Sequence, residues 1–471
     1  MSASHPSPDY ERFSRRFHAD DLSPADRQQW YATRLTTVLR HVTTRSDFYR
    51  ERLAGFDVAA ITPADLHRLP FTTKQDLRTA MHSILSGPVS EAAIYYETTG
   101  TTGAATPCPR SANEIAESNL HVEQSWRRLF ADRFGSRMPL VALMGPSELY
   151  AFGDTFGEVA QRLGSCHAKI WPESSRVGFK KALRLLKELR AEVVVCAPAL
   201  CLSLAKAALH YGYDPRTDFD IGMFLVLGEI CTPELSDNIA SIWGARAVPT
   251  LYGSQEALAI ATGCAQRRLH LSDPNYLVEI VDPGGDAVLG GTGTGELCLT
   301  MLIDGSKPLI RYRTGDLVTV TDERCACGGA GSLIDVHGRV ADRIAIGRAE
   351  LHPAELEAAI LRDVAGCLGY QVVIDDGDDG ESVTVHLDLL PGIAGAADAF
   401  TAGVADRLRA VVGVPVEVVV DDDLDPVTNT GAFISWKAAR IVDNRSAPDD
   451  AALVAREVAH RYAITSSAGD R

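Results

Sequence analysis

The chain alternates short apolar runs with longer stretches of helical periodicity. Residues 1–90 are mostly helical in pattern, with apolar positions at helical spacing in Asp26–His41. Between residues 91 and 335, short β-branched runs alternate with helical patterns such as Val177–Ala191. This alternation predicts an α/β fold with mainly parallel sheets. The expected strands include Val141–Met144, Glu192–Cys196, Met223–Val226 and Ala247–Leu251.

The pattern changes twice in the second half of the chain. After Gly295, two neighbouring strands are expected, which indicates a β-rich subdomain. Beyond Gly338 helices and strands alternate again, as in a small α+β domain. We therefore predict an N-terminal domain over residues 1–337, a small C-terminal domain over 338–445 and a polar tail over 446–471. The later elements are strands at Glu296–Met301, Leu317–Thr321, Tyr370–Ile374, Ser382–Leu389 and Val416–Val420, and helices at Pro353–Arg362 and Ala396–Val412.

Composition narrows the classes of function. The 471 residues are 46% hydrophobic and carry a net charge of −16, which argues against nucleic acid or an anionic membrane as main partner. No apolar run approaches the ~18 residues of a membrane span, and the N-terminus does not resemble a signal peptide. Ten Cys in this length do not make a disulfide scaffold, so we expect a cytoplasmic protein. Only eight of the 46 Lys and Arg residues are Lys, so a Lys within a motif is notable.

A loop rich in Gly and Thr follows the strand-like run Ala92–Tyr96. Glycines allow the backbone to turn tightly and point N–H groups at phosphate oxygens, while hydroxyls add donors. The loop lacks the Gly-Lys-[Ser/Thr] ending of the P-loop NTPases. It is a candidate phosphate-binding loop, or a plain surface loop, formed by Thr98, Thr99, Gly100, Thr101, Thr102 and Gly103.

Four more segments complete an ordered set. They are Tyr252–Glu256, Tyr312–Leu317, Gly338-Arg339 with Asp342 and Pro353 after it, and Trp436–Asp443 around Lys437. In this order the set resembles the motifs of the adenylate-forming superfamily of acyl-CoA synthetases and peptide-synthetase adenylation domains. Within it, Leu69–Lys74, Asp76–Arg78 and Leu309–Arg311 resemble the phenylacetate–coenzyme A ligase branch. The resemblance extends over residues 25–445.

The resemblance implies an enzyme that activates a carboxylic acid with ATP. The acid would form an acyl-AMP with release of pyrophosphate, and the acyl group would pass to a thiol, with coenzyme A as the first candidate. Residues 1–337 would then be the adenylation domain and 338–445 a mobile lid. Mg²⁺ with Glu256 would neutralise charge at the phosphates. The nucleotide would also contact Gly228, Glu229, Tyr252, Gly253, Asp316 (ribose), Arg339 (ribose or phosphate) and Lys437, which would bridge the α-phosphate and the carboxylate.

The acid substrate would be aromatic, or an amino or aminoaryl acid. In the resembled branch, the segment Ser147–Asp154 lines the acyl pocket, and here it carries two aromatic and two acidic side chains. An acid could hold an amino group of the substrate, or both acids could simply be solvated. The candidate pocket residues are Glu148, Tyr150, Phe152, Gly153 and Asp154.

Three Cys and one His form a candidate metal site. Cys264 and His270 are separated from Cys325 and Cys327 by about 55 residues, which is not a standard finger spacing. Three thiols and one imidazole make a closed tetrahedral set for a structural zinc ion. The alternative is that these are reduced cysteines in loops.

Three departures from the family pattern leave the acceptor open. Ala104-Ala105 replaces Lys-Pro after the loop, Ala341-Asp342 replaces Asp-Asp at the hinge, and Gly347-Arg348 inverts Arg-Gly. The last two bear on the second half-reaction. The acceptor could therefore be coenzyme A, a carrier-protein phosphopantetheine or an amine, and a non-catalytic ligand-binding or scaffold homologue is a further alternative. A homodimer is the default oligomer.

Overall fold

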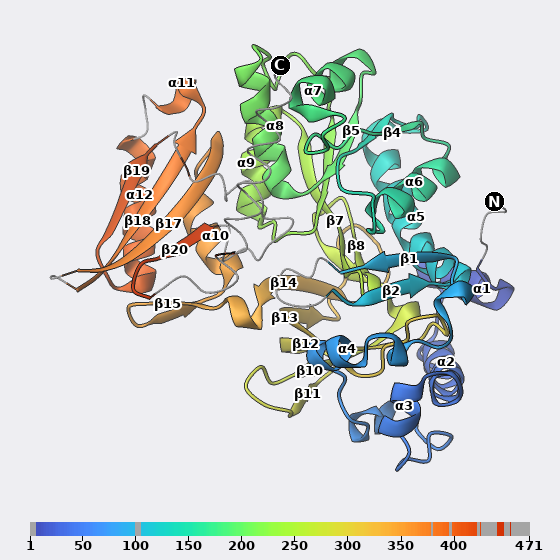
Figure 1. The fold of residues 1–471 in the computed structure, drawn as a ribbon. Coiled ribbons are helices and arrows are strands. Elements are labelled where there is room, and N and C mark those ends of the chain that lie inside the picture. Colours follow the sequence, from blue (N-terminus) through green and yellow to red (C-terminus); the bar gives the residue numbers. More distant parts are fainter. Residues whose placement is uncertain are drawn as a thin grey trace. The chain divides into compact units, whose positions relative to one another are not determined.

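The computed structural model describes residues 6–98, 105–377, 380–394, 398–421, 424, 440–446 and 453. Figure 1 shows the helices and strands, coloured along the sequence. Contacts between Cα atoms divide the chain into two compact units. Unit 1 comprises residues 1–136, 147–163 and 249–336, and unit 2 comprises residues 137–146, 164–248 and 337–471. The predicted domain boundaries at residues 338 and 446 remain predictions.

Unit 1 begins with the predicted helical region. Its two longest helices start at capping boxes. In each box the hydroxyl oxygen of Ser23 or Ser111 accepts from the backbone N–H three residues ahead, and the carboxylate of that later residue accepts from the backbone N–H of the serine. The helices are α1 (Pro8–His18), α2 (Pro24–Arg45), α3 (Asp47–Arg52), α4 (Lys74–Ala80), α5 (Ala112–Phe134) and α6 (Phe152–Leu163).

The strands of unit 1 are antiparallel. Glu296 faces Leu317 in the pair β12–β13, which confirms the predicted β-rich subdomain. Antiparallel pairing starts earlier than expected, because a tight turn after Ser254 brings the chain back on itself at Leu258. The strands that lie wholly or mainly in unit 1 are β1 (Ile94–Glu97), β2 (Pro107–Arg110), β7 (Arg246–Ser254), β8 (Leu258–Gly263), β9 (Leu269–Leu271), β10 (Tyr276–Val281), β11 (Val288–Gly290), β12 (Gly293–Met301), β13 (Tyr312–Thr321) and β14 (Leu333–Arg339), and the start of β7 and the end of β14 are in unit 2.

Unit 2 contains the parallel strands that the sequence predicts. They run in the order β6-β5-β3-β4, and three helices connect or follow them. The strands are β3 (Val141–Leu143), β4 (His167–Lys169), β5 (Val193–Cys196) and β6 (Met223–Leu227), and the helices are α7 (Gly178–Glu188), α8 (Pro198–His210) and α9 (Pro233–Trp243).

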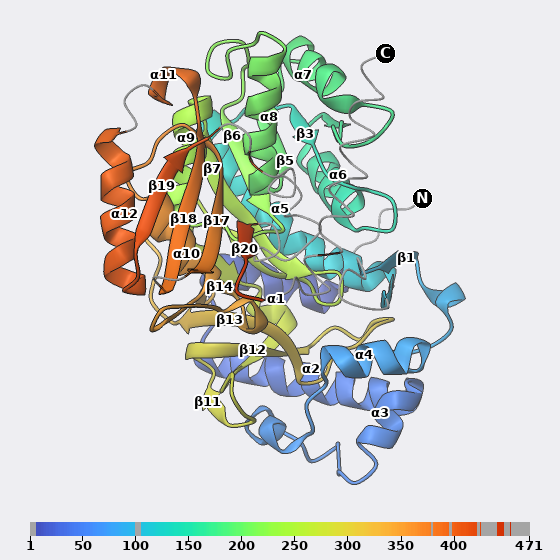
Figure 2. The ribbon, with the colours of Figure 1, turned by 60° about the vertical axis from the view of Figure 1, so that its left-hand side comes forward.

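A second sheet in unit 2 has the order β19-β18-β17-β20. Helix α12 (Asp398–Val412) packs along it beside β19, as Figure 2 shows. This is the predicted α+β arrangement, and the α/β fold class is confirmed. The other elements are β15 (Ile344–Ile346), β16 (Ala349–Leu351), α10 (Pro353–Leu361), β17 (Cys367–Gly377), β18 (Gly380–Leu389), α11 (Pro391–Ala394), β19 (Val416–Val420) and β20 (Ile441–Asp443).

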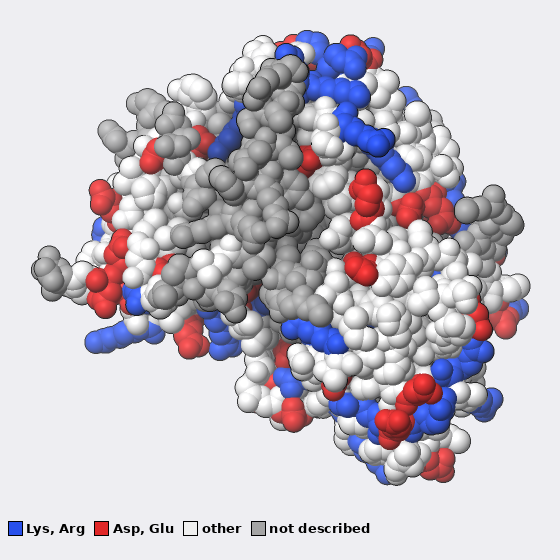
Figure 3. All heavy atoms as spheres, viewed as in Figure 1, with Lys and Arg blue, Asp and Glu red and all other residues white. Residues whose placement is uncertain are grey.

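Charges of both signs are interspersed on the face in Figure 3. Helix α7 carries exposed basic residues, but the charges of two of them are balanced by acidic partners. Lys187 Nζ lies 2.5 Å from Asp218 Oδ1, and Arg184 forms an ion pair with Glu188. Exposed pairs of this kind contribute little to stability. Among the described helices, none has the length and apolar character needed to cross a membrane.

Candidate active site

Two sequence motifs meet in unit 1 through one hydrogen bond. The hydroxyl of Tyr252, on β7, donates to Asp316 Oδ2 on β13 at 2.7 Å. Each of the two residues has a glycine beside it that no other residue could replace without strain. A Cβ at Gly253 would lie 2.0 Å from the carbonyl oxygen of Leu258, and Gly315 has a φ of 78°. Only glycine fits both positions. The two motifs therefore form one surface, with a half-buried carboxylate that can accept hydroxyl groups.

Glu256 follows Tyr252 on the same segment and is nearly buried. Burial raises the pKa of its carboxyl, but Lys74 and then Lys307 outweigh burial and hold the pKa below its usual value. Lys74 Nζ lies 3.7 Å from Glu256 Oε1. Arg110 fixes the backbone, because its Nη2 donates to the carbonyls of Gln255 at 2.5 Å and Glu256 at 2.6 Å. The site therefore offers an ionised carboxylate, which is the kind of ligand that Mg²⁺ prefers.

The predicted phosphate-binding loop starts at a closed hairpin. Thr98 N donates to the carbonyl of Thr106 at 3.2 Å, and Thr106 N donates to Thr98 Oγ1 at 2.9 Å, just beyond the pair β1–β2. Thr98 thus lies at the base of the loop. The remaining predicted members, Thr99, Gly100, Thr101, Thr102 and Gly103, lie outside the described residues.

The candidate acyl segment is bonded to the same motif. Gln255 Nε2 donates to the carbonyls of Leu149 at 3.1 Å and Glu97 at 3.2 Å, and its Oε1 accepts from Ala151 N at 3.3 Å. Asp154, in the first turn of α6, accepts from the Tyr96 hydroxyl at 3.0 Å. This bond occupies one oxygen of an acid that we considered for binding a substrate amino group. The other candidates are placed as half-buried (Tyr150, Phe152), buried (Gly153) and exposed (Glu148).

The remaining nucleotide candidates are in unit 2. Gly228 has a φ of 87°, and Glu229 follows it with a buried carboxyl whose pKa burial raises to about 7, against the effect of Arg440. Arg339 ends β14 with an exposed side chain. Gly338 beside it has a φ of 119°, and a Cβ there would lie 3.0 Å from Pro353. Lys437 lies outside the described residues.

The four candidate metal ligands come together in unit 1. Their ligand atoms all lie within 4.8 Å of one another, with Cys264 Sγ 3.8 Å from Cys325 Sγ and Cys327 Sγ 3.3 Å from His270 Nε2. His270 Nδ1 lies 2.9 Å from the carbonyl of Ala330, which can only accept. Nδ1 therefore carries the proton and Nε2 is left for a metal ion. This donor set fits a structural zinc ion.

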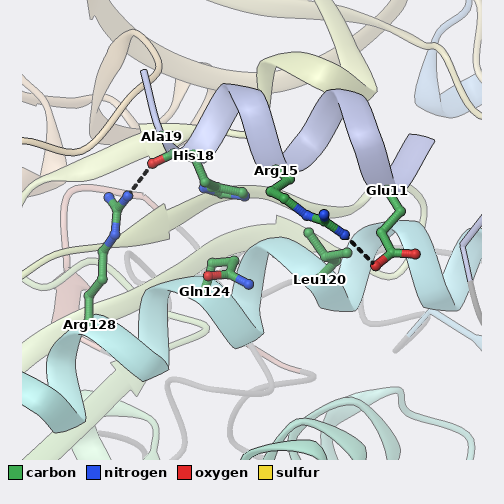
Figure 4. Close-up of a pocket in the computed structure, with 7 residues that line it drawn as sticks. All are labelled: Glu11, Arg15, His18, Ala19, Leu120, Gln124 and Arg128. Carbon is green, nitrogen blue, oxygen red and sulfur yellow. Dashed lines mark hydrogen bonds and ion pairs between the residues drawn. The ribbon is translucent and has the colours of Figure 1, made fainter. Parts of the chain in front are cut away.

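A hollow of about 270 Å³ lies between α1 and α5 (Figure 4). No predicted site residue lines it. Its arginines are engaged, since Arg128 donates to the carbonyl of His18 and Arg15 lies 3.2 Å from Glu11. Burial and Arg128 lower the pKa of His18 to about 4, so His18 is neutral near pH 7. We assign no ligand to this hollow.

Comparisons with known proteins agree with the motifs. The chain is 28% identical to a phenylacetate-coenzyme A ligase of Thermus thermophilus over 353 residues, which is 72% of this chain and 76% of that protein. It is 25% identical to the phenylacetate-coenzyme A ligase of Escherichia coli K12 over 88% of this chain and 94% of that protein. The resemblance to the phenylacetate–CoA ligase branch is confirmed. No family model matches the chain.

Solved structures share the fold. A 2-hydroxyisobutyryl-CoA ligase in its postadenylation state, in complex with 2-HIB-AMP, aligns with a TM-score of 0.75 at 21% identity. The alignment covers 96% of this chain and 94% of that one. At this identity the match establishes the fold, and it extends over nearly the whole of both chains.

Sequence reasoning missed two residues that organise the site. Arg110 and Gln255 hold the backbone and the acyl segment around Glu256, but neither stands out in the sequence. Gln255 occupies a variable position of the aromatic-Gly-x-x-Glu motif, and Arg110 follows Pro-Cys-Pro in a short strand. The capping box of Ser111 and Glu114 directly after Arg110 predicts the start of α5 but gives no signal for the role of Arg110 itself.

Proposed function

We propose that this protein is an ATP-dependent acid–thiol ligase that forms an acyl-AMP and passes the acyl group to coenzyme A. The observation that carries the proposal is the hydrogen bond between Tyr252 and Asp316, which unites two nucleotide motifs beside Glu256. The similarity to phenylacetate-coenzyme A ligases over most of the chain supports the same reaction.

The reaction has two balanced steps. An oxygen of the substrate carboxylate forms a bond to the α-phosphorus of ATP, and the bond from that phosphorus to pyrophosphate breaks. The thiol sulfur then attacks the acyl carbon, loses its proton, and AMP leaves. Asp316 accepts the ribose hydroxyls, and Gly228 and Glu229 lie at the adenine. Arg339 contacts the ribose or phosphate, and Lys437 binds the α-phosphate and the carboxylate.

Two metal ions belong to the proposal. Glu256 would hold Mg²⁺, which would supply positive charge at the phosphates, and its ionised carboxylate supports this role. Cys264, His270, Cys325 and Cys327 would hold a structural zinc ion between the β8–β9 turn and the β13–β14 loop. If so, protein purified without chelator contains one zinc per chain, and a variant with Cys327→Ser contains none. Zinc-free wild-type protein with full stability would refute the zinc site.

The nature of the acid is the next part of the proposal. Glu148, Tyr150, Phe152, Gly153 and Asp154 line the acyl pocket, and Gln255 supports their placement by bonding both neighbours of Tyr150. The two aromatic rings favour an aryl acid. Because Asp154 already accepts from Tyr96, Glu148 is the better candidate to hold an amino group.

A panel of acids tests the function. Wild-type protein with ATP and Mg²⁺ should release pyrophosphate only when a suitable aryl or aminoaryl acid is present. Adding coenzyme A, a phosphopantetheine-loaded carrier protein or an amine, and weighing the products, then identifies the acceptor. Absence of pyrophosphate across a broad panel would favour a ligand-binding homologue instead.

Two lysine variants test the role of Lys437. Lys437→Ala should abolish acyl-AMP formation while ATP still binds, and unchanged pyrophosphate release would refute the role of this lysine. The matched control Lys187→Ala, at an exposed lysine paired with Asp218, should retain activity.

A cytoplasmic location suits the need for ATP and coenzyme A, and light scattering tests whether the protein is a homodimer.

A further inference from the structure

Lys74 has a defined place in the fold. It is the first residue of α4, which starts at a capping box between Thr73 and Asp76. Asp76 N donates to Thr73 Oγ1 at 3.1 Å, and Thr73 N donates to Asp76 Oδ2 at 2.8 Å. Because both bonds close around the helix start, the backbone of Lys74 has little freedom.

The residue before this cap is bonded to the strand that leads to the ribose motif. Thr72 N donates to the carbonyl of Arg311 at 2.8 Å, and its own carbonyl accepts from Arg313 N at 2.9 Å. Thr72 Oγ1 also donates to the carbonyl of Ile310 at 2.7 Å. Lys74 is thus built onto the same framework as Asp316, although the two are far apart in the sequence.

The ammonium of Lys74 faces the carboxylate proposed to hold Mg²⁺. Its Nζ lies 3.7 Å from Glu256 Oε1, and the Lys74 side chain is 33% exposed while that of Glu256 is 6% exposed. Within the described part of the chain, two further cations near Glu256, Arg110 and Lys307, are fully buried. Arg110 pairs with Glu114, and Lys307 donates to the carbonyl of Pro107 at 2.8 Å. Of these three cations, Lys74 is the one that a ligand in solvent can reach.

A cation beside the carboxylate proposed to hold Mg²⁺ suits the proposed reaction. When the bond from the α-phosphorus to pyrophosphate breaks, negative charge grows on the leaving group, and ammonium groups stabilise such charge. The resemblance to the adenylate-forming superfamily implies a lysine directly after the phosphate-binding loop, and this sequence has Ala104 there. A second source of positive charge is therefore required.

We propose that Lys74 is a further catalytic residue, whose ammonium binds the β- and γ-phosphates of ATP and stabilises the departing pyrophosphate. The inference rests on the proposed function and deepens it, since it names the group that replaces the missing loop lysine. Lys74 forms no bond to the acyl group and takes no part in thioester formation.

Binding of ATP and AMP to the full-length protein separates a phosphate contact from a structural role. Calorimetry with Lys74→Ala should give an ATP affinity lower than that of wild type by about 10- to 100-fold, as expected for the loss of one charge-assisted bond. The affinity for AMP, which lacks both phosphates, should stay unchanged. Lys74→Arg should recover part of the ATP affinity, and the control Lys187→Ala should bind both nucleotides like wild type.

The two half-reactions provide the second readout. With an acid that supports turnover, Lys74→Ala should slow pyrophosphate release, whereas the conversion of supplied acyl-AMP to the thioester should proceed at the wild-type rate. Equal losses in ATP and AMP binding, or in both half-reactions, would overturn the proposal in favour of a structural role. Unchanged ATP binding in Lys74→Ala would also overturn it. If wild type binds ATP but releases no pyrophosphate with any acid, the proposed function fails, and the ATP and AMP affinities still decide whether Lys74 contacts phosphate.

Discussion

Two pairs of opposite charges meet at Glu256, and they differ in how fully the protein satisfies them. Arg110 and Glu114 are completely buried, with Nη1 2.9 Å from Oε1. Glu114 Oε2 also accepts from the backbone of Ser111 at 2.7 Å and Ser306 at 2.8 Å. Lys74 and Glu256 lie 3.7 Å apart, and the lysine remains partly exposed. Arg110 connects the pairs, because it donates to the carbonyl of Glu256.

The difference separates a structural pair from a functional one. A completely buried pair such as Arg110 and Glu114 is closed to a ligand in solvent, and removing one partner leaves a charge stranded in the interior. In the looser pair Glu256 is buried but Lys74 is partly exposed, so the ammonium can exchange partners when an ion or a phosphate arrives from solvent. We therefore expect substitutions in the first pair to cost stability and those in the second to cost activity.

The largest expected effect is on stability, at Arg110. Arg110→Met should lower the free energy of unfolding by about 3–5 kcal/mol, because Glu114 and the carbonyls of Gln255, Glu256 and Lys307 lose their buried partner. Denaturation with urea measures the loss. The control Arg127→Met breaks a more exposed pair on α5, the helix that carries Glu114, where Arg127 Nη2 lies 2.7 Å from Glu123 Oε1, and should cost less than about 1 kcal/mol. Equal losses in the free energy of unfolding in the two variants would show that the buried pair is no more important for stability than the exposed one.

Glu256→Gln should act on activity instead. The amide keeps the shape of the side chain but removes its charge, so acyl-AMP formation should fall by a factor on the order of 100. The free energy of unfolding should change little. Rates of pyrophosphate release and urea denaturation measure the two quantities, with Glu188→Gln on α7 as control. A variant that is fully active would contradict the role of Glu256.

A third carboxylate, Glu117, sharpens the contrast by its pH dependence. Its side chain is buried, Oε2 lies 3.2 Å from Arg34, and Oε1 has no hydrogen-bond partner in the described part of the chain. Burial raises its pKa from 4.5 to about 7, although Arg34 opposes the shift. Since the folded pKa lies above the unfolded one, the wild type loses stability as pH rises through this interval.

Glu117→Gln cannot titrate at this position. Its stability relative to wild type should therefore increase by about 2 kcal/mol between about pH 5 and about pH 8, as urea denaturation at both pH values would measure. Glu123→Gln, on the same helix, should show no such trend. A difference between Glu117→Gln and wild type that does not vary with pH would mean that Glu117 stays ionised throughout.

The smallest effect is expected at Tyr252. Tyr252→Phe removes the hydroxyl that orients Asp316, and one such bond is worth about 1 kcal/mol, so the KM for ATP should rise by about five- to tenfold with little change in kcat. Steady-state kinetics measures both constants. Tyr213→Phe, whose ring lies under Lys187, is the control. A fall in kcat alone would place Tyr252 outside ribose binding.

The sequence predicts most of the fold because its elements are locally encoded. The buried valines of β5 and the capping boxes of α2 and α5 indicate their structures directly. Strand direction is less local. The apolar run of β8 fits either direction, and the turn after Ser254, which requires Gly253 to pack against Leu258, sets it antiparallel.

The sequence points to a candidate site residue when the type of its side chain already indicates the chemistry. Glu256, Asp316 and the four Cys and His ligands stand out by type and order, and the cysteines are recognisable although Cys264 and Cys325 are 61 residues apart. Arg110 was not predictable, because its importance comes from burial against carbonyls that are 145 and 146 residues away. The ion pair of Lys74 with Glu256 likewise depends on tertiary structure.

Oxygen labelling tests the acyl-AMP intermediate most directly. An active acid carrying ¹⁸O in its carboxyl group is incubated with ATP, Mg²⁺, coenzyme A and the wild-type protein, and the products are analysed by mass spectrometry. If the carboxylate attacks the α-phosphorus, one labelled oxygen leaves with AMP when the thioester forms. Label in inorganic phosphate with unlabelled ADP as the other product would show attack on the γ-phosphorus, and would contradict an adenylate-forming mechanism.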